Sequence, residues 1–298
     1  MRSMIHRVLL SLALLGQATP AQAAADNSES VASDSPEAWA MRYFAGTSLM
    51  TSFGDTAKLA PWRWNVAADL GSIPRLDDAQ QRVGFGGFKN EDLNKSPAFG
   101  RLRLAIGLPD DWVAELGYTP PLEINGARPR NVVAAAIGRR LLEHDATTLS
   151  VRALGQLGKV RGDITCPARL AGVTDPERNP YGCQAPSQDT FTTDYYGADA
   201  TLGWNAGDWQ AYGSAGIART RLSVQVDAQV FARSDRSRLT SNDRLAWFTA
   251  GVRHDFGARW SVGAEFMYVP LNVRRPPDFA LDRDPLRSVR LQLRYSAD

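Results

Sequence analysis

The chain has 298 residues, with 34 lysines and arginines against 32 aspartates and glutamates. So small a net charge creates no field over the whole protein that would attract nucleic acid, and nucleic-acid binding is excluded. Beyond the N-terminus, no stretch reaches the roughly 18 consecutive apolar residues that a membrane-spanning helix needs. A membrane protein with this sequence would therefore cross the bilayer with strands.

Residues 1–23 have the pattern of a signal peptide. The start is positively charged, an apolar stretch runs from Val8 to Leu15, and Ala21-Gln22-Ala23 is a small-x-small cleavage pattern. The apolar stretch is too short to span a bilayer as a helix. We expect cleavage after Ala23, with Ala25 as the alternative. Because two arginines and no acids leave with this segment, the mature chain is formally neutral.

Residues 24–60 precede the regular pattern of the rest of the chain. Ser35-Pro36-Glu37 predicts a helix start, with serine as the N-cap and proline at the first helical position. Trp39 and Tyr43 would share one face of that helix. The helix could dock beneath a barrel, fill its lumen or lie on a membrane. A different interpretation makes Tyr43 to Phe53 an extra strand, which with a partner would raise the strand count to twelve.

The remainder of the chain repeats one pattern, in which apolar residues alternate with polar or small ones and a turn follows. Alternation with period two is typical of β-strands whose two faces differ. In residues 99–108, for example, Leu102 and Leu104 share one face, and Arg101 and Arg103 share the other. We predict ten strands, near residues 62–73, 99–108, 112–123, 131–142, 147–162, 193–205, 208–224, 244–256, 259–271 and 287–296.

The connections between these runs alternate in length. Tight turns rich in Asp, Asn or Gly lie at 109–111, 143–146, 205–208 and 257–258, and long loops include 74–98, 163–192, 225–243 and 272–286. Bacterial transmembrane barrels have short turns on the periplasmic side and long loops outside, with an even number of strands. The sequence thus predicts an all-β, antiparallel ten-stranded barrel with two unlike ends.

Aromatic residues help to decide which face of the strands meets lipid. They stand on the apolar face at the turn-side ends of the strands, where a membrane barrel has its interfacial girdle. The girdle candidates are Trp62, Trp112, Trp204, Trp209, Phe256 and Trp260. The other face mixes charged with small residues, which suits a crowded, narrow lumen. We therefore expect a transmembrane barrel and not a soluble one.

On this alternation, girdle and loop asymmetry, the chain resembles the bacterial outer-membrane β-barrel proteins as a class, over about residues 61–298. Members of the class usually end on an aromatic residue with apolar residues at alternate positions before it. Val289, Leu291, Leu293 and Tyr295 match that pattern, although Ser296-Ala297-Asp298 follow. The resemblance implies an outer-membrane location after signal-peptide cleavage, and contact with membrane lipid, lipopolysaccharide and the barrel-assembly machinery. Residues 24–60 would then be a periplasmic appendage or a plug.

The face opposite the apolar one carries mainly charged side chains. The lumen-lining candidates are Arg101, Arg103, Glu115, Arg140, Arg152, Asp199, Arg253, Glu265, Arg290 and Arg294, together with Arg63 and Asp69. Arginine is in excess over the acids. Buried charges need partners, so we expect these groups to pair across a narrow interior. The functional alternative is an anion-preferring pore, or a site for a small acidic solute.

Cys166 and Cys183 are the only cysteines, and they lie in a segment rich in Pro, Gly and Asp. In an exported protein this spacing predicts a disulfide that closes a surface loop. Closing a loop of this size contributes roughly 3 kcal/mol by the chain-entropy estimate. With no histidine or further cysteine beside them, metal binding by two thiols is the weaker alternative.

We expect no catalytic site, metal or cofactor. Outer-membrane proteases and lipases place a catalytic histidine near the outer rim of the barrel. Here His6 leaves with the signal peptide, and His144 and His254 fall near the short turns. The sequence therefore favours a structural or surface-interaction role through the long extracellular loops. The alternatives are a narrow anion-preferring channel or solute transporter and, less favoured, a membrane enzyme.

Overall fold

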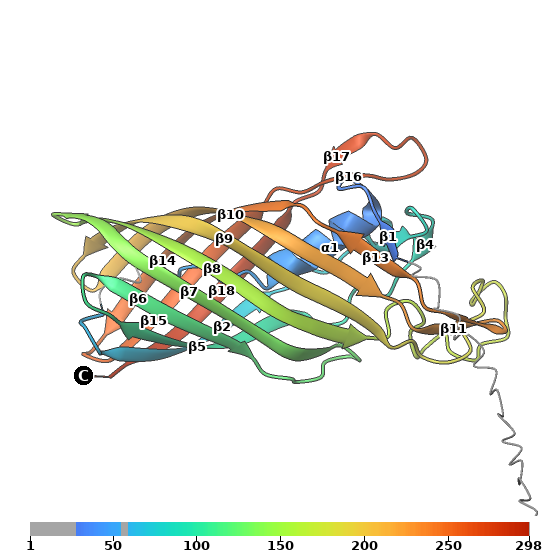
Figure 1. Ribbon diagram of the computed structural model, residues 1–298, viewed down its shortest axis with the longest axis horizontal. Helices are drawn as coiled ribbons and strands as arrows, with labels where there is room; N and C mark the ends of the chain where they lie inside the picture. Colours follow the sequence, from blue (N-terminus) through green and yellow to red (C-terminus); the bar gives the residue numbers. More distant parts are fainter. Residues whose placement is uncertain (1–27, 55–58, 298) are drawn as a thin grey trace, which may run out of the picture.

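The computed structural model describes residues 28–54 and 59–297, and ten long antiparallel strands in it form a closed barrel (Figure 1). Each strand pairs with its neighbours along the chain, and the last strand pairs with the first to close the wall. The ten strands are β2 (Trp64–Ser72), β5 (Ala98–Gly107), β6 (Trp112–Thr119), β7 (Arg128–His144), β8 (Thr147–Gly162), β9 (Asp189–Ala206), β10 (Trp209–Gln225), β14 (Arg244–Phe256), β15 (Trp260–Val269) and β18 (Leu286–Ser296). The predicted all-β, ten-stranded barrel is confirmed.

The two ends of the barrel differ, as the alternating connections predict. The end with the tight turns is called the turn end here, and the other is the loop end. Shorter elements lie at the loop end. The N-terminal segment contributes β1 (Ser28–Ser30). The long connections contain α2 (Asp78–Gln81), β3 (Arg82–Gly84), β4 (Lys89–Asn90), β11 (Ala228–Val230), β12 (Arg233–Asp235), β13 (Arg238–Ser241), β16 (Asn272–Arg274) and β17 (Leu281–Arg283). Some predicted boundaries need correction. The predicted strand 112–123 ends at Thr119, before two prolines that cannot donate to a ladder. The strand predicted at 131–142 runs from Arg128 to His144, and the one predicted at 193–205 begins at Asp189.

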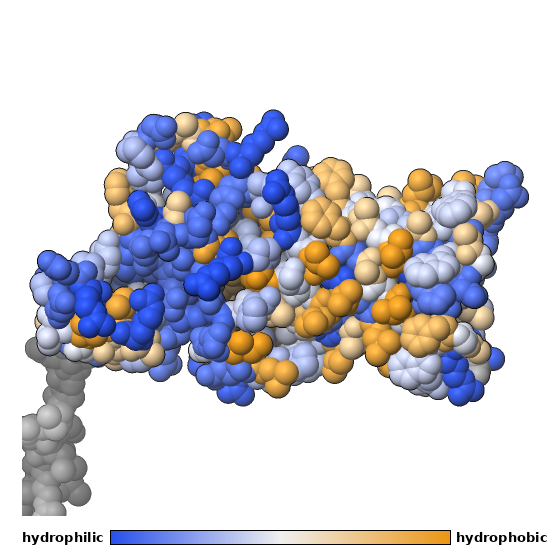
Figure 2. Space-filling view, turned by 180° about the vertical axis from the view of Figure 1, so that it is seen from behind, coloured by the Kyte–Doolittle hydropathy of each residue, from blue (hydrophilic) through white to orange (hydrophobic). Residues whose placement is uncertain are grey.

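Side chains along each barrel strand alternate between a buried lumenal position and an exposed outward one, as in β2. The outward positions are mostly large apolar residues, with Leu70, Leu102 and Phe266 about half exposed. Figure 2 shows hydrophobic residues over the barrel and hydrophilic ones over the loop end. We call the outward apolar surface the apolar belt; it includes Val66, Leu70, Leu102, Leu104, Leu116, Val133, Ile137, Leu157, Leu202, Ile217, Phe248, Val252, Val262, Phe266, Val289, Leu291 and Leu293.

The helix α1 (Pro36–Thr47) begins where the sequence predicts, with the Ser35 hydroxyl accepting from the backbone N–H of Ala38 at 3.2 Å. It lies inside the barrel at the loop end (Figure 1) and is buried on nearly all sides. The interpretation of Tyr43 to Phe53 as an extra strand is wrong, since α1 occupies its first half and no strand follows before Gly54. In the described part of the chain, no helix is long and apolar enough to cross a membrane.

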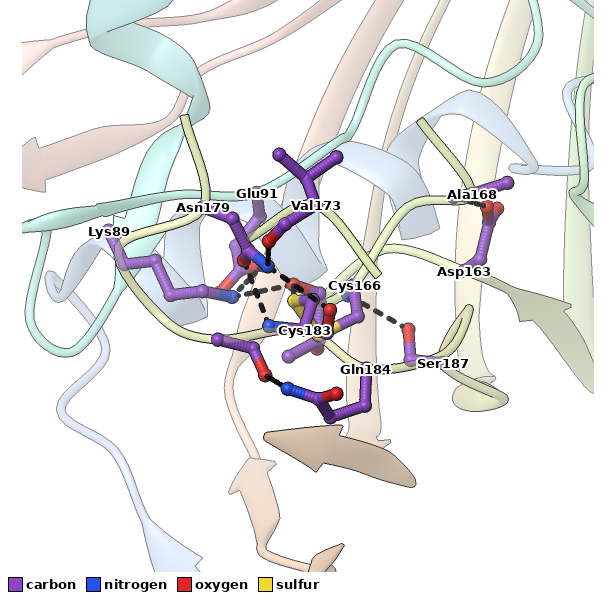
Figure 3. The surroundings of a disulfide bond; sticks show 12 residues. Lys89, Glu91, Asp163, Cys166, Ala168, Val173, Asn179, Cys183, Gln184 and Ser187 are labelled. Carbon is purple, nitrogen blue, oxygen red and sulfur yellow. Dashed lines mark hydrogen bonds and ion pairs between the residues drawn. A yellow bond between two sulfur atoms is a disulfide. The ribbon is translucent and has the colours of Figure 1, made fainter. Parts of the chain in front are cut away.

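A disulfide joins Cys166 and Cys183 in the long loop between β8 and β9, as predicted (Figure 3). The Asn179 side-chain amide accepts from the Cys183 N–H at 2.8 Å and donates to the Val173 carbonyl at 2.8 Å. From the neighbouring hairpin, Lys89 donates to the Thr165 carbonyl at 2.8 Å. The disulfide loop is therefore fixed both to itself and to the β3–β4 hairpin. The long connections of the loop end, residues 73–97, 163–188, 226–243 and 270–285, contact one another, and we call them the cap.

Candidate functional site: the filled lumen and the basic collar

The N-terminal segment runs through the lumen. Below α1, residues 48–54 run as an extended stretch towards the turn end, and Leu49, Met50 and Phe53 are almost fully buried. Gly54 has φ +97°, a backbone conformation that residues with a Cβ rarely adopt, and it lies against the Gln210 side chain near the turn end. Glycine takes this conformation without a steric cost. We refer to residues 36–54 as the plug.

Lumenal arginines hold the plug by its backbone carbonyls. Arg101 donates to Ser48 at 2.7 Å, and Arg103 donates to Thr51 at 2.9 Å. The remaining contacts follow the same pattern: Arg152 to Met50 at 2.9 Å, and Arg290 to Leu49 at 2.6 Å, Gly46 at 3.0 Å and Thr47 at 3.0 Å. The Arg290 contacts satisfy carbonyls at the C-terminus of α1, where a helix leaves acceptors unpaired and the dipole favours a cation.

Two of these arginines, Arg103 and Arg152, also pair with buried acids. Glu115 lies between Arg103 and Arg152, with oxygen-to-nitrogen distances of 2.8 and 2.9 Å. Arg103 also pairs with Asp69 at 2.7 Å, and Arg152 pairs with Asp199 at 2.6 Å. The Arg103 and Arg152 guanidiniums thus each bind acids from the wall and a carbonyl from the plug. The planar, forked geometry of arginine permits this, whereas the single ammonium of lysine would not.

The structure places the predicted lumen-lining residues as follows. Arg101, Arg103, Glu115, Arg152, Asp199, Arg253, Glu265 and Arg290 are buried in the interior, and Arg294 is partly buried and donates to Gln292 at 2.7 Å. Arg140 lies at the turn end, where it pairs with Asp111 at 3.0 Å and Glu143 at 2.7 Å. Arg63 is exposed outside the barrel. It precedes β2, so strand alternation does not determine where it points.

All six predicted girdle residues are exposed, and they adjoin the turn end. Trp112, Trp209 and Trp260 begin strands there, and Phe256 ends one. Trp64, which the sequence reasoning did not include, belongs to the same ring with 43% of its surface exposed. Trp62 lies just before β2 and is 68% exposed. This end of the apolar belt thus carries aromatic side chains on several strands.

A partial ring of basic residues, on β7, β8, β10, β14 and β18, borders the apolar belt on the side of the loop end. In β8, Lys159 and Arg161 follow Leu157 on the outward face, and in β10, Arg219 and Arg221 follow Ile217. We call the ring the basic collar; it comprises Arg128, Arg130, Lys159, Arg161, Arg219, Arg221, Arg244 and Arg287, all exposed. These residues were not among those predicted from the sequence, although the apolar-x-basic order in β8 and β10 was a readable signal.

The basic collar contains three cross-strand pairs of like charge and one pair of opposite charge, in which Arg221 faces Asp194. Across strand pairs, Arg128 faces Arg161, Arg130 faces Lys159, and Arg219 faces Arg244. Like charges directly opposite each other destabilise a sheet. No ion pair formed among residues 28–54 and 59–297 includes a member of the collar. The collar is therefore a surface suited to multivalent anions.

No grouping of at least three possible metal ligands occurs within the described residues. His144 is exposed in its turn, and the His254 ring stacks on Trp209 with the ring centroids 4.3 Å apart. Both histidines lie at the turn end, away from the cap.

No family model matches the chain, and no curated protein matches it. Solved structures similar in fold are outer-membrane β-barrels. They include Ail, the attachment invasion locus protein of Yersinia pestis, at 11% identity and a TM-score of 0.31, covering 80% of this chain and 100% of that one. The translocator domain of the autotransporter NalP from Neisseria meningitidis matches at 10% identity and a TM-score of 0.40, covering 85% of this chain and 91% of that one. The Pseudomonas putida toluene transporter TodX matches at 11% identity and a TM-score of 0.32, covering 78% of this chain and 67% of that one. Similarity this low says nothing about activity, and the barrel assignment rests on the strand pairing.

Proposed function

We propose that the protein is an outer-membrane barrel with a closed lumen, whose basic collar binds the phosphate groups of lipopolysaccharide. The apolar belt supports a bilayer location, because a contiguous apolar surface of this extent is not stable in water. The short turns support an orientation with the turn end in the periplasm and the cap outside. In that orientation the collar lies at the level of the outer headgroups.

The observation that carries the proposal is the set of like-charged pairs across neighbouring strands of the collar. Their mutual repulsion is relieved when anions bind between them, and lipid phosphates are the anions at that depth. Each Lys or Arg near an anionic membrane surface contributes about 1 kcal/mol.

Lipopolysaccharide binding to purified protein in a neutral detergent tests the proposal. The double variant Lys159→Gln/Arg161→Gln removes two collar charges, and Arg63→Gln/Arg139→Gln removes two exposed charges at the turn end as a matched control. Losing about 2 kcal/mol weakens binding roughly 30-fold. The control should bind like the wild type, and the difference should shrink at high salt. Equal affinities of the two double variants would refute the proposal.

A surface-interaction role of the cap is a second candidate, supported by three phenylalanines in the loops. Phe85, Phe231 and Phe279 have φ of +54°, +51° and +54°, and their side chains are 66%, 64% and 43% exposed. A bulky residue in the left-handed region is strained. Strain of this kind tends to persist at functional sites, where an exposed ring serves contact with another surface.

The narrow anion-preferring channel has less support. The arginine excess suggested it, but Arg101, Arg103, Arg152 and Arg290 already bind the plug or lumenal acids. A solute would have to compete with these contacts along a filled lumen.

A further inference from the structure

The barrel wall has a gap between β5 and β6 at the loop end. The ladder between these strands ends at the pair Leu102–Tyr118, although β5 continues beyond it to Ala98. β6 stops at Thr119, and Pro120 and Pro121 follow. Because proline has no N–H, neither residue can extend the ladder. Beyond this point the two strands have no backbone pairing to seal the wall.

A cavity of about 420 Å³ adjoins this gap. Its lining includes Leu70 and Leu102, which belong to the apolar belt, and also Phe44 and Thr193, which belong to the barrel interior. A cavity lined by residues of both faces passes through the wall. Its volume falls within the roughly 300–1,000 Å³ of ordinary ligand sites.

The lining is predominantly apolar. Its inner part is formed by Phe44 of α1, Leu93 of the loop before β5, and Phe191 of β9. Arg101 and Ser48 also line the cavity, and the 2.7 Å hydrogen bond between them joins the wall to the plug. Below this bond the lumen is occupied by the rest of the plug. The cavity is therefore a pocket open to the side, and not a passage through the barrel.

The outward mouth of the cavity adjoins both the apolar belt and the basic collar. Leu70 and Leu102 are 53% and 54% exposed within the apolar belt, and Arg161 of the basic collar also lines the cavity. Arg128 stands opposite Arg161 on the neighbouring strand. A molecule with an apolar chain in the cavity would thus have its headgroup beside two arginines, so the mouth favours an anionic amphiphile.

We propose that this lateral pocket holds one acyl chain of a phosphate-bearing lipid of the outer leaflet, with the phosphate at the collar. The inference rests on the proposed membrane location. An apolar void of this size lacks dispersion contacts on one side, and a lipid chain is the apolar group available at its mouth. The pocket would then select lipids with an acyl chain that can turn from the bilayer into the barrel wall.

Photo-crosslinking tests the proposal directly. The intact protein is reconstituted in vesicles of phosphatidylglycerol that include an analogue with a diazirine near the end of one acyl chain. A chain that stays in the bilayer reaches only belt residues such as Leu116 and Val133. A chain inside the pocket also labels Phe44 and Phe191, which are shielded from the bilayer. We expect labelling at both sets of positions.

Gly100 provides the variant that closes the mouth. It lines the cavity, and a Cβ there would have only the Asp69 carbonyl within 4 Å, at 3.9 Å. Gly100→Trp should abolish labelling of Phe44 and Phe191 while labelling of the belt remains. Gly213→Trp is the matched control, because Gly213 in β10 has a similarly open environment, with its nearest neighbour at 3.7 Å, and does not line the pocket. It should label like the wild type.

Labelling of Phe44 that persists in Gly100→Trp would overturn the proposal, as would its absence in the wild type. Heat-modifiable gel migration checks that each variant is folded, and Gly100→Leu takes the place of the tryptophan variant if that one does not fold. A diazirine fatty acid forms a separate arm: pocket labelling by the fatty acid alone would assign the pocket to free acids and reject the lipid. Unchanged lipopolysaccharide binding in the collar variants, with pocket labelling intact, would count against the proposed function only.

Discussion

Arg290, in the last strand of the barrel, donates a hydrogen bond to the carbonyl oxygen of Leu49 in the plug, across 2.6 Å. The side chain also reaches Gly46 and Thr47, so one guanidinium joins the closing strand to the end of α1. Since β18 pairs with β2 to close the wall, the stability of the seam and the position of the plug depend on the same residue.

Replacing Arg290 by lysine should lower the free energy of unfolding by about 1.5–3 kcal/mol, the usual contribution of a buried hydrogen bond to a charged group. Lysine retains the charge but cannot bind three carbonyls in a forked arrangement. Denaturant unfolding in detergent micelles, monitored by tryptophan fluorescence, measures the change in the free energy of unfolding. Arg287→Lys, on the outward face of the same strand, should have little effect. Equal destabilisation by both variants would show that the contacts with the plug do not matter.

In planar bilayers, the wild-type protein should show no steady unitary conductance, because the plug occupies the lumen. Deleting residues 36–52 should produce discrete current steps in those molecules that still fold, as judged by heat-modifiable migration. Steps of the same size with and without the plug would support the narrow-channel alternative. They would also show that ions pass by a route other than the one the plug fills.

How much of this arrangement the sequence predicts differs between features. Alternation placed Arg101, Arg103 and Glu115 on one face, the aromatic girdle on the opposite face identified theirs as lumenal, and Ser35-Pro36 marked the start of the helix. The acceptors of the arginines were not predictable, because backbone carbonyls have no signature in the residue pattern. Whether the helix enters the lumen depended on packing around its whole surface, and Trp39 and Tyr43 indicated only one face of it.

The phenylalanines of the cap should be dispensable for folding. Replacing Phe85, Phe231 and Phe279 by asparagine, which tolerates left-handed backbone, should leave stability unchanged or raise it by up to about 1 kcal/mol per residue. Adhesion of bacteria that produce the protein to hydrocarbon droplets should fall. Leu281→Asn serves as the control, since Leu281 is 52% exposed in the cap without a positive φ. A large loss of stability in the triple variant would instead assign these rings a packing role.

Glu91 should make the cap sensitive to pH. Burial raises the pKa of this carboxyl to about 7, against the opposing effect of Lys89 at 2.7 Å. The folded state therefore binds a proton that the unfolded state has released between about pH 4.5 and 7, and stability falls as the pH rises through this window. The loss is on the order of 3 kcal/mol.

Limited proteolysis at a series of pH values monitors unfolding of the cap and so measures this effect. Glu91→Gln keeps an acceptor for Lys89 but does not titrate, so the slope between pH 4.5 and 7 should flatten. The exposed Glu123→Gln is the comparison and should retain the slope. An unchanged profile in Glu91→Gln would assign the pH dependence to another group.

The course of the plug through the barrel constrains the order of assembly. Ser28–Ser30 pair with β13 at the loop end, α1 follows within the barrel, and Gly54 lies beside Gln210 near the turn end. The chain thus passes through the ring that it later forms. If β18 paired with β2 first, residues 28–54 would have to thread lengthwise through a finished pore past several buried guanidinium groups. Sealing of the ring should instead be the final event, with the wall wrapping around a segment already in place.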